Sequence, residues 1–312
     1  MVLNKAETPS VPAATRARIL KLAGEFGYQP NHPARMFRSA RTMTLACVIP
    51  DITNPFYPGL VRGLQSVAAP AGYDVLIFDT DGRAEGEERA ANWLLQGRAD
   101  GVVGTFFHLR IPQLAKLAHK GIPIVRLESQ NKPKGPLPID SVYIDNAEAS
   151  AAMTRYLIER GHRRITMILA EVGPSHRRAF GYTSVMRAAG LVPEFVTDSR
   201  YSEQSGARAM GEILAKKRNR ATAVFGANDM LAVGAMVAAR DAGLSVPNDI
   251  AIVGFDDIPA AKLLGLTTVR QPEFDLGALA AQTLVGRLRP DGLAPPGTSL
   301  ELKFEIVKRS SA

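Results

Sequence analysis

From Leu45 onward, short runs of apolar and β-branched residues alternate with longer segments that have helical periodicity. The runs predicted as buried strands are 45–50, 73–79, 101–106, 122–128, 141–145, 163–170, 222–227 and 250–255. The segments predicted as amphipathic helices are 59–71, 85–97, 147–160, 180–189, 205–217 and 230–242. This alternation predicts an α/β fold in which helices cover both faces of a parallel sheet.

The predicted strands are too many for one compact sheet. Two copies of a doubly wound unit, divided near 161–164, explain the number better. Gly72, Gly161, Gly190 and Gly243 each follow a helical run, where a residue at positive φ ends the last turn. Because ligands of such folds lie at the carboxyl ends of the strands, we expect a site in the crevice between the two copies.

The composition fits a soluble globular protein of two domains. Hydrophobic residues make up 46% and charged residues 22% of the 312 residues. Cys47 is the only cysteine, which excludes an internal disulfide and a multi-cysteine metal cluster. No apolar stretch has the length of a membrane span and no secretory signal is visible, so we expect a cytoplasmic location.

The positive charge is concentrated at the start of the chain. Residues 1–44 contain seven Lys and Arg but two Glu, within a net charge of +8 for the whole chain. A short basic head on a nearly neutral body indicates a polyanionic partner. A solvated basic tail is the alternative.

Residues 13–26 predict one amphipathic helix, with Ile19, Leu22 and Phe26 on its apolar stripe. A helix of this length does not fold alone in water. The following segment, 32–41, has too little apolar content to form a core. We therefore expect it to become ordered only against a partner.

A series of short strings runs through the chain in a fixed order. They are VLN at 2–4, GYQPN at 27–31, AR at 34–35, VIPDITNPFYPGLVRGL at 48–64, RADGVV at 98–103, YIDN at 143–146, GHRRI at 161–165, RAFGY at 178–182, GANDMLAVGAM at 226–236, GLSVPNDIAIVGFDD at 243–257 and LTTVRQP at 266–272. Together they resemble the LacI-type family of bacterial transcriptional regulators over essentially the whole chain.

The resemblance implies a partial helix-turn-helix headpiece and a hinge segment in 1–44. An effector core of two periplasmic-binding-protein-like lobes would follow. The first lobe would comprise 45–161 and about 273–298, and the second 162–272 and about 299–309, which includes a last strand at 300–307. The resemblance also implies a homodimer or tetramer in which an effector between the lobes changes how paired hinge segments bind operator DNA.

The headpiece departs from the family pattern, because the recognition helix of family members ends near the VLN string at 2–4. Three explanations stay open: a start codon assigned too late, a truncated remnant or fragment, and a shortened regulator that acts without reading base edges.

By resemblance, the residues that contact DNA are Asn4, Asn31, Arg35, Phe37 and Arg38. Arg35 and Arg38 would neutralise phosphates, which makes the affinity fall with salt. Phe37 matches the position of an apolar wedge that enters the minor groove. An ordinary linker with a stray aromatic residue is the alternative.

The string that follows the first predicted strand contains two aromatic residues, Phe56 and Tyr57. A turn at the carboxyl end of a strand is a position for ligands, and an aromatic face can stack on the C–H surface of a sugar. Alternatively, Phe56 anchors this turn in the core.

Four polar residues at strand ends or helix starts complete the predicted effector site: Asp145, Arg178, Asn228 and Asp256. By resemblance they contact a carbohydrate-like effector, with carboxylates accepting from hydroxyls and the guanidinium donating. Helix capping is the alternative for Asp145 and Asp256, while Asp81 and Asp229 are better explained as caps or salt-bridge partners. We expect Arg178→Ala to abolish the effector response and to leave the fold intact.

Sequence motifs of the common enzyme classes are absent. No G-x-S-x-G elbow, Walker loop or HExxH motif occurs, and the five His residues have no metal-ligand spacing. We therefore expect a regulator, most simply a repressor, without catalytic residues, cofactor or metal. The alternative function is a sugar-binding protein that lacks DNA-binding activity because its headpiece is truncated.

Overall fold

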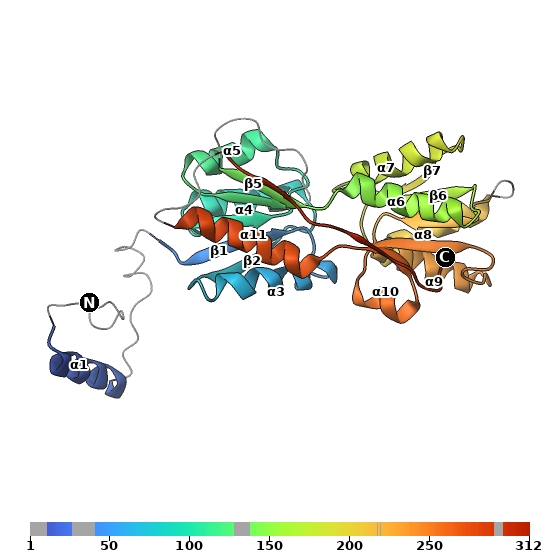
Figure 1. Ribbon diagram of the computed structural model, residues 1–312. Helices are drawn as coiled ribbons and strands as arrows, with labels where there is room; N and C mark the ends of the chain where they lie inside the picture. The colour runs from blue at the N-terminus through green and yellow to red at the C-terminus, as the bar shows by residue number, and fades with distance from the viewer. Residues whose placement is uncertain (1–10, 27–40, 128–137, 217, 219, 290–295) are drawn as a thin grey trace. The chain divides into compact units, whose positions relative to one another are not determined.

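The computed structural model of the chain describes residues 11–26, 41–127, 138–216, 218, 220–289 and 296–312 (Figure 1). The chain divides into two units, Met1–Met43 and Thr44–Ala312. The described part of the first unit contains the helix α1 (Ala13–Glu25), as predicted. No residue of α1 is buried, and Phe26, directly after it, is 83% exposed. The apolar stripe of this helix is therefore open to solvent.

The second unit contains two six-stranded sheets, each with helices on both faces, which confirms the α/β class. The first sheet consists of β1 (Thr44–Ile49), β2 (Asp74–Asp79), β3 (Gly101–Gly104), β4 (Ile124–Leu127), β5 (Ile139–Tyr143) and β11 (Ser299–Glu301). Its strands are parallel and have the order β11-β5-β4-β3-β1-β2. The helices α3 (Phe56–Ala68) and α11 (Glu273–Leu288) cover one face, and α4 (Ala84–Leu95) and α5 (Ile111–His119) cover the other.

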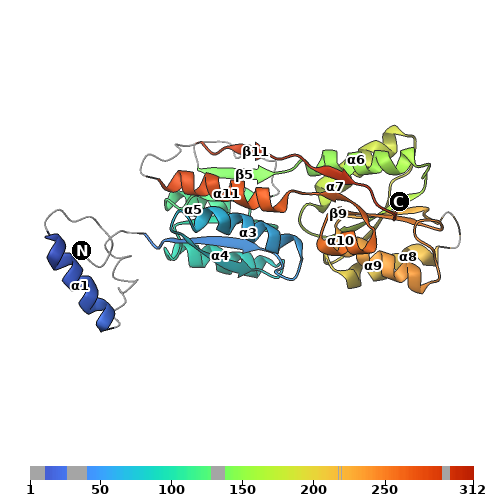
Figure 2. The ribbon, with the colours of Figure 1, turned by 60° about the horizontal axis from the view of Figure 1, so that its bottom comes forward.

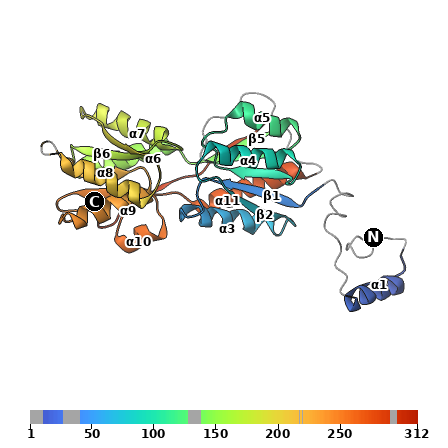
Figure 3. The same ribbon diagram turned by 180° about the vertical axis from the view of Figure 1, so that it is seen from behind.

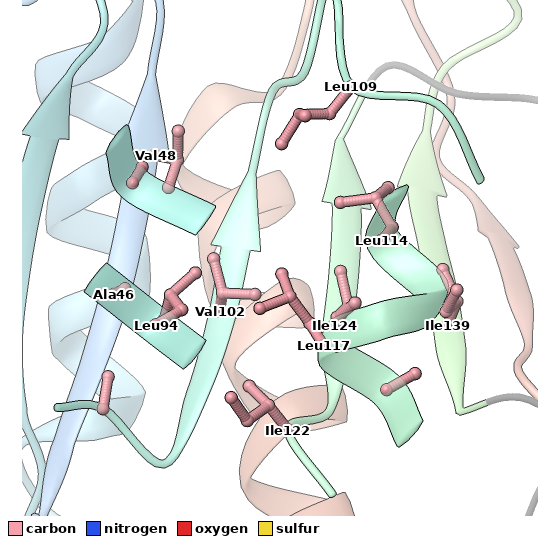
Figure 4. Close-up of a cluster of buried hydrophobic side chains, with 13 residues drawn as sticks. Ala46, Val48, Leu94, Val102, Leu109, Leu114, Leu117, Ile122, Ile124 and Ile139 are labelled. Carbon is pink, nitrogen blue, oxygen red and sulfur yellow. The ribbon is translucent and has the colours of Figure 1, made fainter. Parts of the chain in front are cut away.

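One part of the core of this first lobe lies between the sheet and the helices α4 and α5. Alternate residues of neighbouring strands, such as Ala46, Val102 and Ile124, meet Leu94 and Leu117 from these helices (Figure 4). Each of these side chains is at most 1% exposed. The burial of β-branched and aliphatic side chains on this face fixes the register of the strands.

The second sheet repeats this topology. It consists of β6 (Ile165–Ala170), β7 (Glu194–Asp198), β8 (Ala223–Gly226), β9 (Ala251–Asp256), β10 (Thr267–Arg270) and β12 (Glu305–Val307). The order is β12-β10-β9-β8-β6-β7, and all neighbours are parallel except β12, which is antiparallel to β10. The helices α6 (Asn146–Glu159) and α7 (Ser175–Ala188) pack together on one face (Figure 2). The helices α8 (Glu203–Ala215) and α9 (Asp229–Asp241) pack on the other, with α10 (Pro259–Leu264) beside α9 (Figure 3).

In the described chain, three segments join the two lobes: 144–145, 271–272 and 302–304. The structure places two of the expected boundaries differently. The helix predicted at 147–160 was assigned to the first lobe, but α6 packs on α7, β10 and β12 of the second lobe. The chain crosses directly after β5, at 144–145, and the helix that follows is the first helix of the second lobe.

The last predicted strand, 300–307, is divided between the lobes. Its first part is β11, which pairs with β5 in the first sheet, and its second part is β12, which pairs with β10. The chain forms a strand on each side of the crossing at 302–304. The sequence pattern therefore does not show where the chain passes from one sheet to the other. The helix expected near 273–298 lies in the first lobe, where α11 packs along α3.

The strand predicted at 73–79 exists, but it is not buried. The strand β2 lies at the edge of the first sheet, and Leu76 and Ile77 are 40% and 38% exposed. The helix-terminating glycines are confirmed, because Gly72, Gly161 and Gly243 have φ of 81°, 94° and 78°. Among the described helices, none is long and apolar enough to cross a membrane.

Candidate ligand-binding site

A cavity of about 320 Å³ lies at the carboxyl ends of the strands of both sheets. Its lining consists of Pro50, Asp51, Asn54, Phe56, Tyr57, Asp81, Gly82, Arg83, Phe107, Val172, Pro174, Arg178, Ser199, Arg200, Tyr201, Ser202, Asn228 and Asp256. These residues follow or end β1, β2 and β3 in the first lobe and β6, β7, β8 and β9 in the second. The cavity therefore lies where doubly wound folds bind ligands, beside the strands at which the connection changes direction.

The first-lobe wall begins with the turn between β1 and α3. The Asn54 side chain accepts a hydrogen bond from the Phe56 backbone N–H at 3.1 Å, and the Asp51 carboxylate accepts one from Thr53 at 2.8 Å. These contacts fix the start of α3. Phe56 and Tyr57 both line the cavity, as expected, yet each is only 4% exposed. Their rings meet edge to face with centroids 5.2 Å apart, so they form a rigid apolar wall.

Arg178 forms part of the second-lobe wall and is almost entirely buried, with 2% of its surface exposed. Its Nε donates to Asn146 Oδ1 at 2.8 Å and its Nη1 donates to the Ala227 carbonyl at 2.5 Å. Its Nη2 lies 3.7 Å from Asp256 Oδ1, and the guanidinium stacks 3.6 Å from the centre of the Phe255 ring. Burial of this charge is offset by one carboxylate, two oxygen acceptors and an aromatic face.

Asp256 ends β9 with a φ of 120°, a conformation that costs energy for a residue with a side chain. Its Oδ1 also accepts a hydrogen bond from Gln271 Nε2 at 2.7 Å. Asn228 caps α9, with its Oδ1 accepting from the Leu231 backbone N–H at 2.9 Å. Both residues line the cavity.

Asp145 differs from the other predicted effector residues. Its carboxylate caps α6 by accepting from the backbone N–H groups of Ala147 at 2.9 Å and Glu148 at 3.0 Å. It is not part of the cavity lining, so the capping interpretation describes its place. The next residue, Asn146, contacts Arg178 instead. The YIDN string at 143–146 therefore indicated the right region, but the residue that contacts the cavity wall is Asn146, one position after Asp145.

Several lining residues were not predicted. Phe107 follows β3 and reaches the second lobe, since a Cβ atom on Gly173 would lie only 2.8 Å from its ring. The backbone N–H groups of Phe107 and Leu109 each donate to the buried Glu87 carboxylate at 2.7 Å. Tyr201 shares a hydrogen bond with Ser175 at 2.6 Å. These residues lie in turns without a distinctive pattern, so only their place after a strand could have indicated them.

Charged groups surround the opening of the cavity. Arg200 Nη2 donates to Asp81 Oδ1 at 2.9 Å, and Arg83 Nε lies 3.0 Å from Asp81 Oδ2. The Arg200 guanidinium holds the pKa of the Asp81 carboxyl below its usual range. Asp81 is thus a salt-bridge partner, and it also lines the cavity.

Asp229 supports the wall from behind. It is fully buried, and burial raises its pKa to about 6 although Thr268 and the Ile258 backbone N–H donate to its carboxylate. Cys47 lies within β1, where burial raises its thiol pKa to about 12. In the described ranges, no group of three or more His, Cys, Asp or Glu residues is placed to hold a metal ion.

The residues expected to contact DNA are Asn4, Asn31, Arg35, Phe37 and Arg38. All five lie outside the described residues.

The sequence is similar to a known domain family and to known regulators. Residues 154–312 match the model of a periplasmic binding protein-like domain. The chain is 34% identical over 280 residues to the HTH-type transcriptional regulator DegA of Bacillus subtilis, a match that covers 87% of this chain and 82% of DegA.

Two solved structures are similar in fold. A LacI family transcriptional regulator from Enterococcus faecium with bound ribose has a TM-score of 0.75 at 27% identity and covers 86% of this chain and 98% of its own. The complex of the transcriptional regulator CelR with cellobiose has a TM-score of 0.74 at 28% identity and covers 100% of this chain and 94% of its own. With its two repeated lobes, the cavity between them and these relatives, the chain belongs to the LacI-type family of transcriptional regulators.

Proposed function

We propose that this chain is a DNA-binding transcriptional repressor controlled by a small carbohydrate-like effector that binds in the cavity between the two lobes. The observation that carries the proposal is that residues following or ending strands of both sheets line one cavity of about 320 Å³. The size is within the range of small-molecule sites. The ribose and cellobiose bound to the structural neighbours support a sugar or a related polyol or sugar acid as effector.

The chemistry of the lining supports a hydroxylated ligand. Phe56, Tyr57 and Phe107 supply apolar faces for ring C–H groups, while Asn228 and Asp256 supply groups that bind hydroxyls. The predicted roles of Phe56, Tyr57, Arg178, Asn228 and Asp256 in effector binding remain part of this proposal. Arg178 would act chiefly by holding Asp256 and Asn146 in place, since its Nε and Nη1 donate to Asn146 and the Ala227 carbonyl and its Nη2 lies beside Asp256.

The effector would act by favouring one arrangement of the lobes. A ligand that contacts both walls binds more tightly when the walls are at the matching separation, and this difference in affinity shifts the population of arrangements. Residues of the cavity wall form hydrogen bonds beside or within two of the segments that join the lobes. Arg178 contacts Asn146, beside 144–145, and Asp256 contacts Gln271, within 271–272. By linkage, operator DNA bound through residues 1–44 would change effector affinity by the same factor.

The chain is proposed to act as a homodimer or tetramer in the cytoplasm. Exposed Leu76 and Ile77 on the edge strand β2 support an apolar contact between copies. We propose no catalytic activity, which is consistent with relatives that are transcriptional regulators. A sugar-binding protein without DNA-binding activity is the second candidate, and measurement of DNA binding separates the two.

The effector site is tested by thermal unfolding of the chain in the presence of sugars, polyols, sugar acids and purines. A ligand at 100 times its Kd should stabilise the fold by about 2.7 kcal/mol. Asn228→Ser keeps a helix cap but removes the amide from the cavity, so it should lose most of this protection. Asn248→Ser, an exposed amide far along the chain, is the matched control. A ligand that protects both variants equally binds elsewhere and contradicts the proposed site.

DNA binding is tested by fluorescence anisotropy with DNA selected from a random pool. Affinity should fall steeply with salt, because phosphate contacts release counterions, and the effector should change it. A chain that binds the effector but not DNA at low salt would support the second candidate.

A further inference from the structure

One carboxylate at the opening of the cavity pairs with two guanidinium groups. Asp81 follows β2 in the first lobe, and Arg200 follows β7 in the second. Their 2.9 Å hydrogen bond is therefore a contact between lobes, and Arg83 approaches the other carboxylate oxygen of Asp81 at 3.0 Å. All three residues line the cavity.

The backbone fixes Asp81 in this position. Its φ of 53° lies in the left-handed region, and its N–H donates to Asp79 Oδ1 at 2.9 Å. The following residue, Gly82, also has positive φ, at 61°. Two successive residues at positive φ set the direction in which the Cα–Cβ bond of Asp81 leaves the turn.

The remaining arginine of the lining also has its partners. Arg178 donates to Asn146 and to the Ala227 carbonyl and lies beside Asp256. Each of the three arginines among the described lining residues is thus paired with a carboxylate. The lining contains equal numbers of Asp and Arg, since Asp51, Asp81 and Asp256 match Arg83, Arg178 and Arg200.

We propose that Asp81 is a specificity-determining residue that favours uncharged, hydroxylated effectors over anionic ones by occupying Arg83 and Arg200. This inference rests on the proposed function and narrows it, because it disfavours sugar acids and sugar phosphates. An anionic group entering the cavity must displace Asp81 from its partners or lose its hydration without a counter-charge. A hydroxyl group can donate to Asp81 and accept from an arginine without either loss.

The test uses inorganic phosphate as the probe and the full chain. Asp81→Asn keeps the side-chain size and suits the positive φ, but it frees two guanidinium groups. Glu212→Gln on the exposed surface of α8 changes the net charge equally and is the matched control. Melting temperatures are measured against phosphate concentration at constant ionic strength.

We expect phosphate to bind Asp81→Asn about twofold to fivefold more tightly than the wild type, and the control to behave as the wild type. The range is modest because the side chains of Asp81 and Arg200 are 53% and 52% exposed, and exposed ion pairs contribute little energy. A wild type that phosphate already protects as strongly as the variant overturns the proposal. So does a variant that gains no protection.

The result does not depend on finding the effector. If no hydroxylated compound protects the chain, the proposed function fails, while the phosphate measurement still decides the role of Asp81. If a sugar protects the wild type but its phosphate ester protects more strongly, the proposed function stands and the proposed selection against anions is refuted.

Discussion

Replacement of Arg178 by alanine should destabilise the second lobe strongly. The substitution removes a buried guanidinium that is 2% exposed and leaves Asp256, 5% exposed, without its counter-charge. It also removes the hydrogen bond that Asn146 Oδ1 accepts from Arg178 and the stacking of the guanidinium on the Phe255 ring. Breaking a buried ion pair by removing one partner costs about 3–5 kcal/mol, and we expect the free energy of unfolding to fall by this amount. This prediction differs from the sequence-based expectation that Arg178→Ala leaves the fold intact.

Urea denaturation followed by circular dichroism measures the effect. Arg187→Ala, an exposed arginine in the last turn of the same helix, is the matched control and should cost less than about 1 kcal/mol. The double variant Arg178→Ala, Asp256→Asn should be less destabilised than the sum of the single variants by about 1–3 kcal/mol, because the unpaired carboxylate is gone. Additive single effects, or a loss below about 1 kcal/mol for Arg178→Ala, would refute the buried pair.

Two further predictions concern buried carboxylates. Burial raises the pKa of Asp229 to about 6, above about 3.9 for an unfolded chain, so its contribution to stability is complete below pH 4 and is lost as the pH rises through 6. In urea denaturation at different pH values, the free energy of unfolding of the wild type should fall by about 3 kcal/mol relative to that of Asp229→Asn. A difference in unfolding free energy between the two proteins that does not change with pH would contradict the raised pKa. Glu87→Gln replaces one of two acceptor oxygens that face three backbone N–H groups, so it should cost about 1–3 kcal/mol and speed hydrogen exchange at Phe107 and Leu109. Unchanged exchange at these amides would show that Glu87 does not anchor the loop.

The sequence predicted the regular part of the fold because burial on both faces of a parallel sheet leaves a strong signal. The eight predicted runs each overlap a strand, and the six predicted helices each overlap a helix. The missed strands are short or polar: β7 has one buried residue, and β10 is a four-residue segment rich in threonine. The missed helices α5 and α10 span nine and six residues, too few for a clear period.

The sequence indicated those residues of the candidate site whose place follows from a strand end or a helix start. Arg178, Asn228 and Asp256 lie at helix starts or strand ends, and the structure brings them together. Asp81 and Arg200 could not be paired from the sequence, because they are 119 residues apart and both lie in turns with ordinary exposed residue types. Their contact depends on how two lobes are placed, which no local pattern encodes.

Glycines explain why the walls of the cavity are held at fixed positions. A Cβ atom on Gly63 of α3 would lie 1.9 Å from the Phe274 carbonyl of α11, and one on Gly234 of α9 would lie 1.8 Å from the Glu203 carbonyl of α8. Each lobe therefore has a helix pair in backbone contact, and α3 and α9 begin at or directly after the lining residues Phe56 and Asn228. Since a packed interior does not deform continuously, we expect the wall residues of each lobe to move with their helix pair as a unit. We therefore expect an effector that bridges the walls to act on the segments between lobes, where Asn146 and Gln271 already contact the wall.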